Sequence, residues 1–186
     1  MPPKPFRPAV GQAPAKPLTC FDTVVAFLKA DDWPFEADDE SGTVTTGYSG
    51  DNGDYEVVLE AKNEASMFAV HVDLPVEHQA DNNDDDAPAA FGELVEMVLK
   101  LNCGLAVGSF DLDIDDGSLR FRIGVLVGDA APSPALVRDQ IYAAVTSADL
   151  YFTLLQAVAA GELTAEAALE KLAAEANAED QEAAAD

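Results

Sequence analysis

Apolar and polar residues alternate most regularly in two stretches near the middle of the chain. In the first stretch the apolar positions are Phe110, Leu112 and Ile114, separated by Ser109, Asp111, Asp113 and Asp115. In the second they are Leu119, Phe121, Ile123 and Val125, with Arg120 and Arg122 between them. A period of two is typical of half-buried strands, and Asp116-Gly117 favours a turn between them. The pattern predicts an antiparallel hairpin whose polar side matches Asp against Arg.

The segment before this hairpin predicts more strands, punctuated by glycine. We expect them near Phe35 to Ala37, Thr43 to Tyr48, Tyr55 to Ala61 and Met67 to Leu74, as an antiparallel meander. In the last strand His71 falls on the face opposite the apolar residues, which favours a solvated or sheet-edge histidine.

Helical spacing of apolar residues predicts four helices. Thr19 and Asp22 form a possible capping box for the first, and Asp31-Asp32 ends it. The second runs from about Ala87 to Leu101, with Gly104 as a left-handed cap. The third runs from about Ala135 to Gly161, and the last opens at Thr164 and fades after Ala176. Together these elements predict an α+β fold.

The third helix is apolar over much of its circumference. Such a surface favours packing both on the sheet of its own chain and on a second chain or element. We therefore predict a homodimer. The interface candidates are Ile141, Val145, Tyr151 and Phe152, and packing in the core of one chain is an equal alternative for them.

Composition divides the chain into three parts. Residues 1–17 hold six prolines and three basic residues without an acid, so we expect a disordered leader. It could be a ligand for a partner or an arm over the acidic body, but a flexible leader is favoured. Residues 18–176 are expected to form one domain, and residues 177–186 a disordered acidic tail.

The net charge of −25, from 35 acidic and 10 basic residues, argues against binding to nucleic acid or an anionic membrane, since both need a basic patch. It suits a proteome in concentrated salt, where charges are screened. No apolar run reaches the roughly 18 residues of a membrane span, and no secretory signal is visible. We expect a soluble, cytoplasmic protein.

Candidate chemistry is sparse. Asp111, Asp113 and Asp115 imitate a calcium loop, but Asp116 and Arg122 stand where Gly and Glu are needed. His71 and His78 are too few ligands for zinc, and the run 81–86 is more typical of a solvated loop than of a cation site. Cys20 and Cys103 favour buried free thiols over a disulfide. We predict no catalytic residue, no cofactor and no metal.

A group of residues around the hairpin resembles the YbjN family of bacterial sensory transduction regulators. The strongest part comprises Asn102, Gly104-Leu105, Gly108-Ser109-Phe110-Asp111-Leu112-Asp113, Asp116-Gly117 and Leu119-Arg120-Phe121-Arg122. Weaker matches are Asp32-Trp33-Pro34-Phe35-Glu36, Leu74-Pro75-Val76 and Ala160-Gly161-Glu162-Leu163-Thr164. The resemblance covers about Cys20 to Leu169.

The family's fold is similar to that of type III secretion chaperones. The resemblance implies an antiparallel sheet with helices on one side, in the order α-β-β-β-α-β-β-α, and a tendency to dimerise and to grip extended protein segments. It implies no catalytic residue.

Two functions follow from the sequence, beside a purely structural role in which the domain assembles only with itself. The first is a non-enzymatic protein-binding module, chaperone-like or regulatory, that holds an unidentified protein partner with a sheet face and the wide helix. The alternative is a small-ligand sensor or an enzyme whose acidic pocket contains Trp33 and Tyr48.

Overall fold

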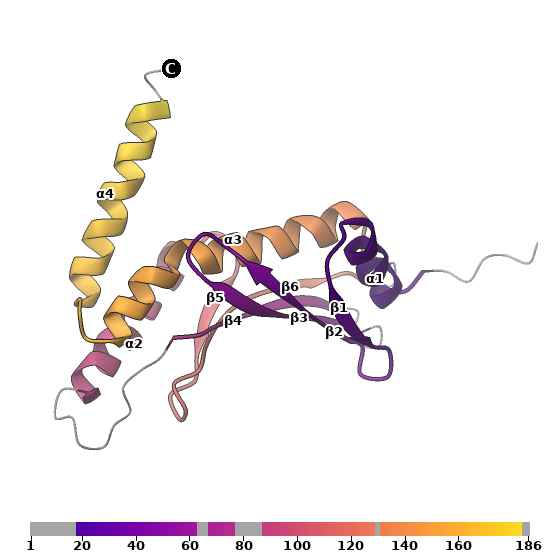
Figure 1. Ribbon diagram of the computed structural model, residues 1–186, viewed down its shortest axis with the longest axis horizontal. Coiled ribbons are helices and arrows are strands. Elements are labelled where there is room, and N and C mark those ends of the chain that lie inside the picture. Colours follow the sequence, from indigo (N-terminus) through magenta and orange to yellow (C-terminus); the bar gives the residue numbers. More distant parts are fainter. Residues whose placement is uncertain (1–17, 63–66, 77–86, 129–130, 184–186) are drawn as a thin grey trace, which may run out of the picture.

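Ten helices and strands make up the part of the chain that the computed structural model describes, residues 18–62, 67–76, 87–128 and 131–183 (Figure 1). The helices are α1 (Cys20–Ala30), α2 (Ala87–Gly104), α3 (Pro134–Ala159) and α4 (Ala165–Ala183). The strands are β1 (Phe35–Asp38), β2 (Thr43–Ser49), β3 (Asp54–Lys62), β4 (Met67–Leu74), β5 (Ser109–Leu112) and β6 (Leu119–Leu126). Compared with the order implied by the family, the chain has a fourth strand before α2 and an additional helix at its end.

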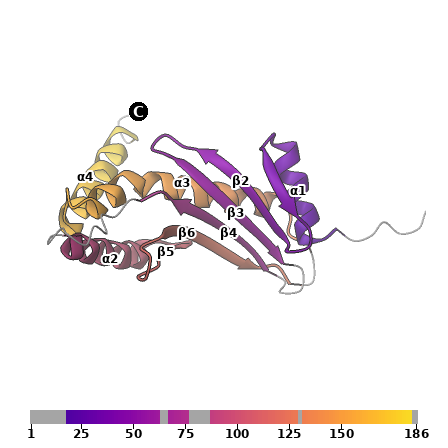
Figure 2. The ribbon, with the colours of Figure 1, turned by 60° about the horizontal axis from the view of Figure 1, so that its bottom comes forward.

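The strands form one antiparallel sheet in the order β1-β2-β3-β4-β6-β5. Helix α3 lies along one face of this sheet, with α1 near one end and α2 near the other (Figure 2). The opposite face carries the polar positions of the strands. The predicted α+β class, with an antiparallel sheet and helices on one side, is therefore confirmed.

Alternation along the strands explains the core. In β4 the side chains of Phe68, Val70 and Val72 are fully buried beneath the helices, and β6 repeats the pattern with Leu119, Phe121 and Ile123. A strand with one face on a core and the other in water has this period of two.

Helix α3 is apolar on a wide surface because several elements cover it. It contacts β4 and β6 along the sheet and also α1, α2 and α4. By length and composition it could cross a membrane, but half of its most apolar window is buried inside the domain. The width of the apolar surface thus reflects packing within one chain.

This packing corrects the interface candidates on α3. Ile141 and Val145 have no exposed surface, and Phe152 retains 6%. Tyr151 is half-buried, with its ring 5.6 Å from that of Phe110. The side chains of Ile141, Val145 and Phe152 pack in the core and Tyr151 packs against it, whereas the exposed large apolar residues of α3 are Tyr142 and Leu150.

Helix ends follow the local sequence in most places. The capping box is confirmed, because Thr19 Oγ1 accepts a hydrogen bond from the Asp22 amide and the Asp22 carboxylate accepts one from the Thr19 amide. The predicted left-handed cap at Gly104 is wrong, since Gly104 is the last helical residue. The left-handed glycine of this connection is Gly108, with φ +79°.

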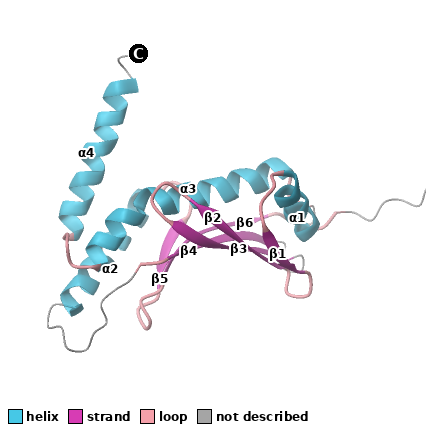
Figure 3. Ribbon diagram, in the orientation of Figure 1, coloured by secondary structure: helices cyan, strands magenta, loops and turns pink. Residues whose placement is uncertain are grey.

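The hairpin is confirmed, but its first strand is shorter than predicted. Strand β5 ends at Leu112, and a loop of residues 113–118 replaces the two-residue turn (Figure 3). In this loop Asp113 Oδ1 accepts a hydrogen bond from the Asp115 amide, and Asp116 Oδ1 accepts one from the Ser118 amide. These aspartate turns divert the chain, which leaves Ile114 73% exposed instead of on the core face.

Helix α4 begins against α2 and α3 and then extends away from the sheet (Figure 1). Ala165 and Ala168 are buried in its first turns, and Thr164 Oγ1 accepts a hydrogen bond from the Ala167 amide. The helix continues past the predicted boundary at residue 176. The leader (residues 1–17), His78 and the acidic run 81–86 lie outside the described residues.

Candidate functional site

The face of the sheet opposite the helices carries two arginines on β6. Arg120 lies between Asp73 of β4 and Asp111 of β5 in the strand register, and Arg122 lies between His71 and Ser109. No other two basic residues in the described part of the chain stand two positions apart on one strand face. We use the name arginine row for the two arginines and their four strand neighbours, His71, Asp73, Ser109 and Asp111.

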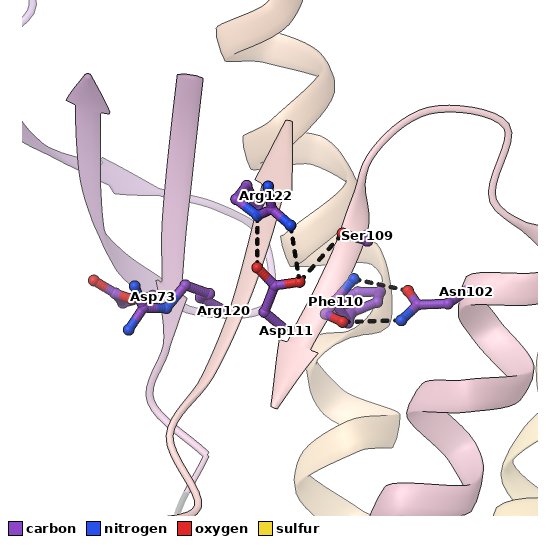
Figure 4. Close-up of polar contacts among 7 residues, drawn as sticks. All are labelled: Asp73, Asn102, Ser109, Phe110, Asp111, Arg120 and Arg122. Carbon is purple, nitrogen blue, oxygen red and sulfur yellow. Dashed lines mark hydrogen bonds and ion pairs between the residues drawn. The ribbon is translucent and has the colours of Figure 1, made fainter. Parts of the chain in front are cut away.

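The arginines are held by aspartates of the neighbouring strands (Figure 4). Arg122 Nε donates to Asp111 Oδ2 at 2.6 Å, and Nη2 lies 3.5 Å from Oδ1. This hydrogen bond raises the pKa of Arg122. Arg120 Nε is 3.7 Å from Asp73 Oδ1. The predicted matching of Asp against Arg is therefore confirmed. The shorter pair is diagonal, because Asp111 lies opposite Arg120 in the strand register but binds Arg122.

An open hollow of about 390 Å³ lies over the arginine row. It is lined by His71, Asp111, Leu112, Asp113, Ser118, Arg120 and Arg122. Both arginine side chains are nearly half exposed, at 45% for Arg120 and 47% for Arg122. Exposed ion pairs of this kind contribute about 0–1 kcal/mol to stability, so the arginines can exchange partners at little cost to the fold.

His71 lies at the inner wall of this hollow. It occupies β4, a central strand, and is half-buried, so it is neither at a sheet edge nor fully solvated. Its Nδ1 atom is buried without a hydrogen-bond partner in the described structure. Burial lowers the pKa of His71, with further lowering by Arg120 and Arg122 against the opposite effect of Glu60 and Asp73. The imidazole is therefore neutral near pH 7.

Asn102 holds the outer edge of β5. Its side-chain oxygen accepts from the Phe110 amide at 2.8 Å, and its side-chain nitrogen donates to the Phe110 carbonyl at 2.9 Å (Figure 4). One amide side chain thus occupies both backbone groups that an added strand would use at this position. The sequence analysis placed Asn102 in the strongest part of the YbjN resemblance but predicted no contact for its side chain. An asparagine in the last turn of a helix, just before a strand, could have indicated a side chain that bonds to the backbone of that strand.

Gly108 fixes the entry into β5. Its φ of +79° is strained for other residues, and a Cβ atom there would lie 2.5 Å from the Phe121 ring. The adjacent Phe110 ring packs edge-to-face on Phe121 at 4.9 Å. Because Asp111 follows Phe110, these contacts set the position of the carboxylate that binds Arg122.

A second polar cluster, at Asp149 of α3, lies on the helical side. Asp149 is only 9% exposed, and its carboxylate accepts hydrogen bonds from the amides of Asp51 and Asn52 at 3.0 and 2.9 Å and from the Tyr55 hydroxyl at 2.7 Å. A Cβ atom on Gly50 would lie 2.2 Å from Asp149 Oδ1. The carboxylate therefore fixes the β2–β3 turn.

Burial and hydrogen bonding oppose each other at Asp149. Burial is the largest single effect and raises the pKa of Asp149, but the donors from Tyr55, Asn52 and Asp51 together outweigh it and hold the pKa below its usual value. Burial, followed by the Asp149 bond, raises the pKa of Tyr55 well above its usual range. Asp149 was not among the residues predicted to matter, although it stands four residues after Val145 and three before Phe152, among the apolar residues of α3.

Trp33 and Tyr48, the residues of the alternative ligand pocket, do lie together. Their rings stack at 6.0 Å, and Tyr142 of α3 packs edge-to-face on Trp33 at 6.0 Å. Asp31 Oδ2 accepts hydrogen bonds from Trp33 Nε1 and from the Tyr142 hydroxyl. This aromatic cluster lies where the α1–β1 turn, β2 and α3 meet.

The remaining candidates lie apart. Cys20 is buried, which raises the pKa of its thiol, whereas Cys103 is exposed, contrary to expectation, and the two do not form a disulfide. Asp113 and Asp115 stay in the β5–β6 loop. Within the described ranges, no three His, Cys, Asp or Glu side chains are grouped to hold a metal ion.

Comparisons with known proteins find one family and similar folds. The model of the YbjN family, "Putative bacterial sensory transduction regulator", matches residues 21–157. No curated protein matches the chain.

Two solved structures share part of the arrangement. A chain of the HopA1–SchA chaperone–effector complex is 14% identical, with a TM-score of 0.41 over 70% of this chain and 89% of that chain. A chain of the ExsC–ExsE complex is 12% identical, with a TM-score of 0.48 over 73% and 92%. Both likenesses concern the fold alone.

Proposed function

This chain belongs to the YbjN family, and from that premise we propose that it is a non-enzymatic regulator that acts by binding another protein. The arginine row on the uncovered sheet face is the proposed binding surface. The observation that carries the proposal is that two adjacent, half-exposed arginines line an open hollow there.

Arginine suits this role for physical reasons. Its planar guanidinium forms paired hydrogen bonds with carboxylates and stacks on aromatic rings, and arginine is enriched at the centres of protein interfaces. In the free protein Asp111 and Asp73 hold the two guanidinium groups in place. A partner segment with its own carboxylate or aromatic side chains can replace these contacts on the solvent side.

The form of the hollow favours a protein over a small molecule. Small-ligand sites are concave, mostly apolar and enclose most of the ligand surface. The hollow over the arginine row is open, and six of its seven lining residues are polar or charged. Such a surface recognises the side chains of an extended or folded partner.

The polar clusters of the described domain also support a binding role. The Asp149 carboxylate is occupied by donors from the β2–β3 turn and from Tyr55, which assigns it to stability.

The setting and assembly of the protein are further parts of the proposal. We place it in a cytoplasm rich in salt, since 35 acidic residues against 10 basic ones repel one another less when screened. Homodimerisation stays a prediction. Because Ile141 and Val145 are buried, an apolar dimer contact by α3 would use the exposed Leu150 and the half-buried Tyr151, and light scattering of the purified chain measures dimerisation.

Quantitative affinity capture tests the binding proposal. The full chain, tagged, would be compared with the variant Arg120→Glu/Arg122→Glu in extracts at about 0.15 M and about 1 M KCl, where the Debye length falls from about 8 to about 3 Å. We expect a stoichiometric partner on the wild type and its loss from the variant, whose fold should persist because both side chains are exposed.

The matched control is Lys100→Glu/Arg138→Glu. It makes the same charge change and also breaks two exposed ion pairs, with Glu96 and Asp139, but on helices α2 and α3. This control should retain the partner. Equal recovery of every bound protein by all three chains would contradict the assignment of the arginine row.

A further inference from the structure

The aromatic cluster has an exposed side. Tyr142 is 38% exposed, Trp33 and Tyr48 are each half-buried, and the neighbouring carboxylates of Asp31 and Asp32 are exposed. From this surface the rings continue inward, since Tyr48 stacks on Tyr55 at 6.4 Å. Exposed aromatic rings are the side chains on which proline-rich segments dock, and neighbouring acidic groups attract the basic residues of such segments.

Backbone hydrogen bonds hold Trp33 in this place. Asp32 adopts a left-handed conformation with φ +56°, and the Trp33 amide donates to the Leu28 carbonyl at 3.0 Å. This is the bond of a Schellman motif, in which glycine is the usual left-handed residue. With Asp there, the turn carries a backbone strain that glycine would avoid and presents an additional carboxylate beside the rings.

The leader has the sequence of a ligand for such a surface. Its prolines give three Pro-x-x-Pro spacings, Pro2 to Pro5, Pro5 to Pro8 and Pro14 to Pro17. Segments of this type favour the polyproline II conformation, which loses little entropy when it docks on aromatic side chains. Lys4, Arg7 and Lys16 lie within these spacings.

Charge favours contact between leader and domain. The leader contains three of the ten basic residues and no acid, so all 35 acidic residues follow it. The remaining seven basic residues leave the rest of the chain strongly negative. A basic leader therefore lowers the electrostatic free energy by lying against the domain rather than away from it.

The length of the leader allows Pro2 to Pro8 to reach the cluster. The leader joins the chain just before α1, and Asp31 and Trp33 follow the other end of that helix. The 11 residues of α1 span about 16 Å. Residues 9–17, at about 3.1 Å each, extend up to about 28 Å. Pro14 to Pro17 is too near α1 to return this far.

We propose that residues 2–8 of the leader dock on Trp33, Tyr48 and Tyr142 of the same chain, with Lys4 and Arg7 beside Asp31 and Asp32. The leader is then an internal ligand of the aromatic cluster. This contact is independent of the arginine row, which lies on the other face of the sheet.

Trp33 reports directly on this contact because it is the single tryptophan of the chain. We would measure acrylamide quenching of its fluorescence in the full-length native protein. The variant Pro2→Ala/Pro5→Ala/Pro8→Ala keeps every charge but removes the Pro-x-x-Pro spacing. Its quenching constant should rise about twofold if docking covers the exposed ring edge, and Lys4→Glu/Arg7→Glu should produce a rise of similar size.

The leader itself provides matched controls. Pro14→Ala/Pro17→Ala and Lys16→Glu make the same kinds of change in the part of the leader that is too near α1 to reach the aromatic cluster. Both should leave the quenching constant unchanged. Equal quenching in the wild type and in Pro2→Ala/Pro5→Ala/Pro8→Ala would overturn the proposal. So would protection of Trp33 that disappears on dilution, which would assign the contact to the leader of another copy. Unfolding midpoints of the variants should lie slightly below that of the wild type, because the core is unchanged and only a contact of the folded state is lost.

Discussion

Asp149 and Asp111 are both carboxylates that bind a neighbouring strand or turn, but their surroundings differ. Asp149 is 9% exposed and accepts from two backbone amides and a tyrosine hydroxyl. The Asp111 side chain is 40% exposed and holds Arg122. Removing a buried acceptor leaves its donors unpaired, whereas an exposed ion pair is readily replaced by water. The contrast separates a cluster that stabilises the fold from one that is available to a partner.

The largest expected effect is at Asp149. Asp149→Asn keeps the size of the side chain but replaces an acceptor by a donor that faces other donors. We expect the free energy of unfolding to fall by about 3 kcal/mol in urea titrations. Asp139→Asn, an exposed change on the same helix, should alter it by under about 0.5 kcal/mol. Equal effects of the two changes would remove the distinction between the clusters.

The pH dependence tests the same carboxylate without a change of structure. Because the pKa of Asp149 is lowered in the folded state, its contribution is present above the unfolded value of about 3.9 and is lost as the pH falls through the folded value. The difference in unfolding free energy between wild type and Asp149→Asn should therefore shrink below about pH 4. A difference that stays constant to pH 2 would contradict this assignment.

An intermediate effect is expected at Asn102, which joins α2 to β5. Asn102→Ala leaves the Phe110 amide and carbonyl without their side-chain partner, so we expect a loss of about 1.5 kcal/mol in thermal or urea unfolding. Asn177→Ala is the matched control, since that exposed asparagine bonds only within its own helix. Faster hydrogen exchange at the Phe110 amide of Asn102→Ala would locate the effect, and unchanged exchange would count against it.

The smallest effect is expected in the arginine row. A double-mutant cycle of Asp111→Asn and Arg122→Gln should give a coupling free energy below about 1 kcal/mol, and about 1 M KCl should reduce it further. A coupling above about 2 kcal/mol would mean that this pair holds the fold, as Asp149 does, and is not free for a partner.

The sequence was sufficient for features set by local patterns. Strand β4 and the capping box of Thr19 and Asp22 follow from alternation and from local hydrogen bonds, and both are confirmed. The YbjN resemblance, which rests mainly on residues 102–122, is also confirmed. Ile114 shows the limit of such patterns. The alternation of apolar and polar residues continues to Ile114, but aspartate side chains bond to the backbone of the loop and β5 ends at Leu112.

Features set by distant contacts could not be read from the sequence. Asp149 meets the β2–β3 turn about a hundred residues earlier in the chain, and a period in sequence does not locate such a partner. The width of the apolar face of α3 indicated that it packs on several elements, but not that α1, α2 and α4 of the same chain supply them. For the same reason an interface and the core of one chain were equal alternatives for Ile141, Val145 and Phe152.

One measurement tests the separation of the two clusters most directly. It compares partner recovery per mole of folded protein between Asp149→Asn and Arg120→Glu/Arg122→Glu, at a temperature where both variants are folded. The account predicts that folded Asp149→Asn keeps the partner, whereas the folded arginine variant loses it. Retention of the partner by the arginine variant, or its loss from folded Asp149→Asn, would contradict the account.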